Sequence, residues 1–142
     1  RDLHSFPTRR SSDLNLFEPL RKRALQALGD VLEDVRLSFR MVSSPACLVD
    51  SSQGMSFQME QLMRAMGQAL PPQKRVLELN AEHPIVLRLM RMAEADEAEV
   101  EDFLAVLYDQ ALILEGGTLS DPASFVKRLS AVMALALQRE GD

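Results

Sequence analysis

The sequence has few of the side chains that most often carry catalysis. Its 142 residues include one cysteine, two histidines, one tyrosine and no tryptophan. A single cysteine excludes a disulfide within the chain and suits a reducing compartment, so we expect a cytoplasmic location. Without histidine or cysteine clusters at ligand spacing there is no material for a zinc site. His83 before Pro84 is typical of a helix cap or loop, and Cys47 of a small buried hydrophobe.

Phosphate-binding and membrane-spanning signatures are also missing. Gly116-Gly117 lacks the lysine and hydroxyl of a P-loop, and the acidic run from Glu94 to Asp102 lacks the glycine and ligand order of a calcium loop. No apolar run approaches the roughly 20 residues of a membrane span. The net charge of −5 disfavours a nucleic-acid surface. We therefore expect no catalytic, cofactor-binding or metal-binding residues, and no nucleic-acid or membrane partner.

The length and the apolar content of 46% fit one globular domain with a core. The segment from Arg1 to Leu14 shows no helix or strand period, and its residues 5–14 resemble a translated sequencing adapter. We expect a non-native or disordered head over 1–14, with a natural linker as the alternative, and one domain over 15–142. Because the chain begins with Arg1 rather than methionine, we expect a fragment.

The remaining patterns predict an α+β fold of order α-β-β-α-β-α-α-α, with a small three-stranded sheet packed with helices. Period-two or short apolar runs indicate strands over 35–41, 46–49 and 76–79. Helical spacing indicates helices over 15–28 and 55–66, from about Pro84, from the acidic run to Gly116, and from Pro122 to about residue 138. Asp121 before Pro122 marks a helix start, and Asn80 is a candidate cap for the helix near Pro84.

The last predicted helix is apolar almost all round in its second half. A helix that is apolar on every side must be buried on every side, and a second copy of the chain can supply that cover. A central helix in the core of a monomer is the alternative, which the pattern leaves open. One face comprises Phe125, Leu129, Val132, Met133 and Ala136, and the other sides comprise Val126, Ala131, Ala134, Leu135 and Leu137.

Four of the eight methionines lie on one predicted helix, at Met55, Met59, Met63 and Met66. The flexible thioether fills irregular gaps, so such a stripe is usually core. The pattern alone favours that interpretation, with an adaptable binding surface as the alternative.

Five segments, in chain order, resemble the C-terminal dimerisation domain of the bacterial-type ninety-kilodalton heat-shock chaperone family. The resemblance covers roughly residues 15–138. The segments are Asp34–Ser38, Ser44–Val49, Met55–Met59, Glu78–Pro84 and Leu107–Pro122.

The resemblance implies a homodimerisation and client-contact module of an ATP-dependent chaperone that assists folding and binds unfolded proteins. The last two helices would form a four-helix bundle with those of a second copy, and the methionine-bearing helix would face clients in the cleft between the arms. The implied client-binding residues are Met55, Met59, Leu62 and Met63. The implied dimer interface comprises Phe103, Leu107, Leu114, Phe125, Leu129, Val132, Met133 and Ala136.

The resemblance also places ATP and magnesium in N-terminal and middle domains of the parent chain, so the fragment itself is expected to be neither an enzyme nor a cofactor-binding unit. The Met-Glu-Glu-Val-Asp tail of cytosolic eukaryotic members is not found here, so no co-chaperone partner of that class is implied. The alternative function is a stand-alone dimeric α+β regulatory domain that binds a small ligand.

Overall fold

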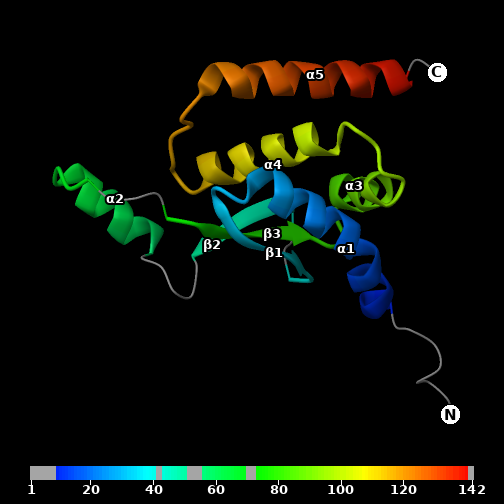
Figure 1. Cartoon of the computed structure of the whole chain (residues 1–142), viewed down its shortest axis with the longest axis horizontal. Helices are drawn as coiled ribbons and strands as arrows, with labels where there is room; N and C mark the ends of the chain where they lie inside the picture. Colours follow the sequence, from blue (N-terminus) through cyan, green and yellow to red (C-terminus); the bar gives the residue numbers. More distant parts are fainter. Residues whose placement is uncertain (1–8, 41–42, 51–55, 70–72, 141–142) are drawn as a thin grey trace, which may run out of the picture.

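The computed structural model describes residues 9–40, 43–50, 56–69 and 73–140. The predicted element order, α-β-β-α-β-α-α-α, is confirmed (Figure 1). The elements are α1 (Arg9–Leu28), β1 (Leu32–Ser38), β2 (Ala46–Asp50), α2 (Phe57–Ala65), β3 (Arg75–Asn80), α3 (Pro84–Glu94), α4 (Val100–Leu114) and α5 (Pro122–Glu140).

The three strands form one mixed sheet in the order β1-β3-β2. β3 lies in the centre, parallel to β1 and antiparallel to β2. Five of its six residues are buried, which is typical of a strand covered on both faces. This sheet and the five helices confirm the predicted α+β class.

The first strand lies three residues earlier than its alternating pattern predicts, over 32–38 instead of 35–41. A register shift separates Leu32 from Asp34 in the pairing with β3. In a regular strand, residues three positions apart point to opposite faces. Leu32 and Val35 are nevertheless both buried, because the irregularity between them changes the alternation of faces. The predicted inward residue Met41 lies outside the described residues.

Helix α1 extends into the segment for which the sequence predicts no helix. It begins at Arg9, so residues 9–14 are helical although their sequence shows no helical period, while residues 1–8 lie outside the described part. Whether the head is native stays a prediction.

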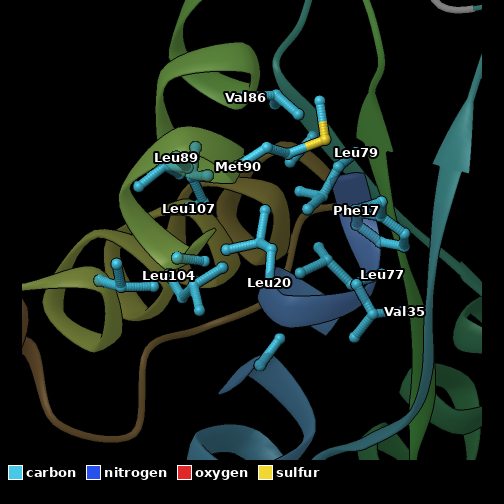
Figure 2. Close-up of a cluster of buried hydrophobic side chains, with 14 of the residues drawn as sticks. Phe17, Leu20, Val35, Leu77, Leu79, Val86, Leu89, Met90, Leu104 and Leu107 are labelled. Atoms are coloured by element: carbon cyan, nitrogen blue, oxygen red, sulfur yellow. The ribbon is translucent and has the colours of Figure 1, made fainter. Parts of the chain in front are cut away.

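The hydrophobic core lies where α1, α3 and α4 meet the sheet (Figure 2). Phe17 and Leu20 reach it from α1, and Leu77 and Leu79 from β3. Helices α3 and α4 supply further buried side chains. These are Val86, Leu89, Met90, Leu104 and Leu107.

Ion pairs of two arginines fasten α1 to its neighbours. The Nη2 of Arg21 lies 2.8 Å from the Oδ1 of Asp34 at β1. The Nη2 of Arg23 donates to the Oε1 of Glu101 over 2.6 Å, which links α1 to the first turn of α4. Glu101 belongs to the acidic run from Glu94 to Asp102, so this part of the run helps to hold α1 and α4 together.

Local capping signals in the sequence are largely confirmed. His83 caps α3, because its Nδ1 accepts a hydrogen bond from the Ile85 amide over 3.1 Å. Asn80 is not that cap, since its side chain bonds the Ser44 carbonyl and the Glu82 amide instead. Asp121 caps α5 by accepting from the Ser124 amide over 3.1 Å.

Helices α2 and α5 lie outside this core. Figure 1 shows α5 lying along α4 on the side away from the sheet, and α2 projecting beyond the end of the molecule opposite α3. These two peripheral helices are the ones that the sequence singles out.

Candidate functional site

In the part of the chain that the structure describes, no group of three or more His, Cys, Asp or Glu residues could hold a metal ion, and no helix is long and apolar enough to cross a lipid bilayer. Cys47 is half-buried on β2, rather than fully buried as expected. Burial, with smaller contributions from Glu78 and Glu115, raises the pKa of its thiol. A raised pKa disfavours the nucleophilic thiolate.

A cavity of about 500 Å³ lies between α2, α4 and the α4–α5 connection. Burial raises the pKa of the Asp109 carboxyl that lines it, and the charge of Arg128 opposes that rise. Because both charge signs line the cavity, it offers no uniform field for a small ion. The charged lining residues are Glu60, Arg64, Arg75, Asp109, Asp121 and Arg128.

The first candidate surface is an apolar face on the two last helices. Helix α5 packs on α4, yet none of its described side chains is buried. An apolar helix with one side on its own domain and the other uncovered is typical of an interface between chains. We use the name α4–α5 apolar face for the exposed large apolar residues of these two helices, which are Ile113, Leu114, Val126, Met133 and Leu137, with exposed fractions of 47%, 68%, 58%, 55% and 68%.

The structure places the predicted interface residues in three environments. Leu114, Met133 and Ala136 are exposed, and Phe103, Phe125, Leu129 and Val132 are half-buried. Leu107 is 3% exposed, so it lies in the core of the chain rather than on its surface. Its buried position follows from helical spacing, since it follows Leu104 by three residues on the face of α4 that meets the sheet.

Three exposed positions were missing from the predicted interface, namely Ile113, Val126 and Leu137. Val126, Met133 and Leu137 are seven and four residues apart, which puts them on one side of α5. The sequence therefore contains a signal that these three residues share one side of α5. The sequence alone cannot tell which side of an all-apolar helix faces α4.

The second candidate surface is the apolar stripe of α2. Met59, Leu62 and Met66 are 49%, 55% and 69% exposed, and Met63 is half-buried. The core interpretation that the methionine pattern favours is therefore wrong for Met59 and Met66. Met55 lies outside the described residues. We call Met59, Leu62 and Met66 the α2 stripe.

Helix α2 begins and ends at recognisable signals. The Ser56 hydroxyl accepts from the Met59 amide over 3.2 Å and caps the first turn. Gly67 follows the helix with φ of 86°, a left-handed conformation that suits glycine. Glu60 in the first turn and Arg64 in the last also complement the helix dipole. The helix is therefore locally specified although its side chains are mostly exposed.

The chain is similar to known proteins over most of its length. A family model described as Hsp90 protein matches residues 7–142. The chain is 48% identical over 116 residues to a protein from Chromobacterium violaceum named Chaperone protein HtpG, covering 82% of this chain and 18% of that relative. A protein of the same name from Methylococcus capsulatus is 42% identical over 123 residues, covering 87% and 19%. The chain thus spans less than a fifth of the length of these curated relatives.

Proposed function

This chain belongs to the Hsp90 protein family, and we propose that it is the homodimerisation and client-contact module of an ATP-dependent chaperone that assists protein folding. The observation that carries the proposal is the exposure of two separate apolar surfaces, the α4–α5 apolar face and the α2 stripe, on a domain that has its own buried core. Apolar patches of this kind mark interaction sites. The small-ligand regulatory domain is not favoured, because the relatives are named as chaperones.

The α4–α5 apolar face supports dimerisation as the role of the last two helices. Burial of its five large apolar side chains against a second copy would remove them from water, and a two-fold arrangement lets one face serve both chains. Each such side chain contributes about 1.5–3 kcal/mol when fully buried. The proposed arrangement is a four-helix bundle of α4 and α5 from each chain.

The dimer proposal is tested by Met133→Asp, measured by light scattering at several concentrations. A charge in a buried interface is left unpaired, which costs several kcal/mol, so we expect a monomer with unchanged circular dichroism. The matched control is Met59→Asp, the same chemical change at a similarly exposed methionine of α2, which should stay dimeric. A folded Met133→Asp variant that remains dimeric would contradict the proposed interface.

The α2 stripe supports client contact, because it gathers flexible apolar side chains on a helix that projects from the domain (Figure 1). Methionine adapts its shape to partners of different sequence. Unfolded proteins expose apolar segments of many sequences, so they fit such a surface. The proposed client residues are Met55, Met59, Leu62 and Met63, to which the exposure of Met66 adds one more.

ATP and magnesium are proposed to bind parts of the full-length protein outside this chain, which would make the parent protein an ATPase and this module non-catalytic. The proposed setting is a cytoplasmic, heat-shock-related chaperone. The chain itself would contribute the contact between copies and part of the client surface.

A further inference from the structure

Among the α2 side chains that the structure describes, the one buried against the domain is charged. Of the α2 side chains that the structure describes, Glu60 is buried, at 8% exposed, and Met63 is half-buried. The others are exposed. A peripheral helix normally attaches through its apolar stripe, whereas here that stripe faces solvent.

The partner of Glu60 is Arg75, the first residue of β3 and only 4% exposed. One guanidinium nitrogen of Arg75 pairs with Glu60 and another pairs with Asp50, the last residue of β2. The second carboxylate oxygen of Glu60 accepts from the Nη2 of Arg64 over 2.9 Å. Arg75 therefore bridges α2 to the end of the sheet where β2 and β3 are paired, since Asp50 and Arg75 are register partners.

Such an anchor differs physically from an apolar contact. Burying two charges costs desolvation free energy, and an apolar pair of similar volume is often as stable or more so. A guanidinium that bonds two carboxylates does, however, fix direction, because its donors form a rigid planar fork. An apolar contact is not directional in this way. The Glu60–Arg75 pair is thus better suited to orienting α2 than to stabilising the domain.

The location of the pair matters for the surface next to it. Glu60, Gln61 and Arg64 of α2 line the cavity of about 500 Å³, and so do Tyr108 and Asp109 of α4. Helical spacing puts the α2 stripe on the other side of α2 from these three α2 residues. By holding Glu60 against Arg75, the ion pair keeps the polar side of α2 towards the cavity and the stripe directed outwards.

We propose that Glu60 and Arg75 are positioning residues that orient α2 so that the α2 stripe is presented to an unfolded client polypeptide. The proposal rests on the client-contact function proposed above, and it adds that the ion pair, rather than the stripe alone, determines affinity. A helix of nine residues is too short to be stable in water by itself. Loss of the pair should therefore both misdirect α2 and loosen its backbone.

The test is Glu60→Gln in the whole chain, with amide hydrogen exchange followed by mass spectrometry. We expect α2 to exchange roughly tenfold faster or more while β3 is unchanged, because α2 opens as a local unit. Affinity for a reduced, carboxymethylated and permanently unfolded protein should fall about tenfold. The matched control is Glu94→Gln, which breaks the exposed pair with Arg91 at 3.6 Å and should change neither quantity.

A second variant separates positioning from mere charge. Arg75→Lys keeps the positive charge but cannot bond both carboxylates through a fork, so its exchange rate and client affinity should lie between those of the wild type and Arg75→Gln. Unchanged α2 exchange in Glu60→Gln, or an α2 that already exchanges freely in the wild type, would overturn the proposal. Weaker client binding without faster α2 exchange would also overturn it, since Glu60 would then contact the client directly.

The failure of the client role is distinguishable from the failure of this inference. If substituting Met59 and Leu62 leaves client affinity unchanged while Glu60→Gln still loosens α2, the ion pair orients the helix but clients bind elsewhere. That result would overturn the proposed presentation to clients and leave the anchor established.

Discussion

The double substitution Met59→Ala, Leu62→Ala separates a binding surface from a core stripe. Complete burial of one such side chain contributes about 1.5–3 kcal/mol, but these two are 49% and 55% exposed in the folded chain. About half of that contribution is therefore absent, and no closed cavity forms at a surface position. Alanine also favours the helix by a few tenths of a kcal/mol. We expect each change to lower the free energy of unfolding by less than about 1 kcal/mol.

The matched control is Leu104→Ala, because Leu104 is fully buried in the same chain. Its loss removes transfer free energy and leaves a cavity, which together cost about 2–5 kcal/mol. Urea denaturation of both variants gives the two free energies on one scale. In the proposed dimer, dissociation would be coupled to unfolding, so the comparison is made at one protein concentration.

For client affinity we expect the opposite order, with a larger loss in the double variant than in Leu104→Ala. Titration of a fluorescently labelled, permanently unfolded protein should give binding about tenfold or more weaker for the double variant, since tenfold corresponds to about 1.4 kcal/mol. Leu104→Ala, if folded at the assay temperature, should bind almost normally. A loss of about 4 kcal/mol or more in the double variant, or unaltered client binding, would refute the reasoning and return the stripe to a packing role.

Three further predictions concern chemistry and backbone. Calorimetry of this chain with ATP and magnesium should show no heat of binding, and a micromolar dissociation constant would instead revive the small-ligand alternative. The hydrogen bonds from Arg23 lower the pKa of Glu101, so their contribution to stability is present above the unfolded pKa of about 4.3 and is lost as pH falls through the folded value. Denaturation midpoints of Glu101→Gln and the wild type should therefore differ at pH 7 and converge in acid, and a constant difference would contradict this linkage. Gly116 has φ of 88° with open space around it, so Gly116→Ala should destabilise by about 1–2 kcal/mol from the left-handed backbone alone, and Gly116→Asn by less. Thermal unfolding gives both values, and equal losses would point to another cause.

Much of the fold follows from local patterns. The order of elements, the end of α4, the start of α5 and the His83 cap are specified by residues a few positions apart, through helical spacing, capping side chains and glycine. The predicted start of α4 in the acidic run is too early, because Glu94 ends α3 and α4 begins at Val100. The boundaries of β1 were misplaced because a register shift against β3 is a property of the pairing, and the partner strand lies about 40 residues away in the sequence. Residues 9–14 were missed because their pattern is weak, although α1 includes them.

The sequence alone determined the element types, the small number of histidine and cysteine residues and the resemblance of five segments to the chaperone family, because each depends on residue identity and short-range spacing. Only the tertiary structure decided that Leu107 is buried, that Val126, Met133 and Leu137 lie on the open side of α5, and that the α2 stripe faces solvent. It alone joined Glu60 to Arg75. Exposure and pairing depend on how elements distant in the sequence pack, and an apolar stripe has the same periodicity whether it meets a core, a second chain or water.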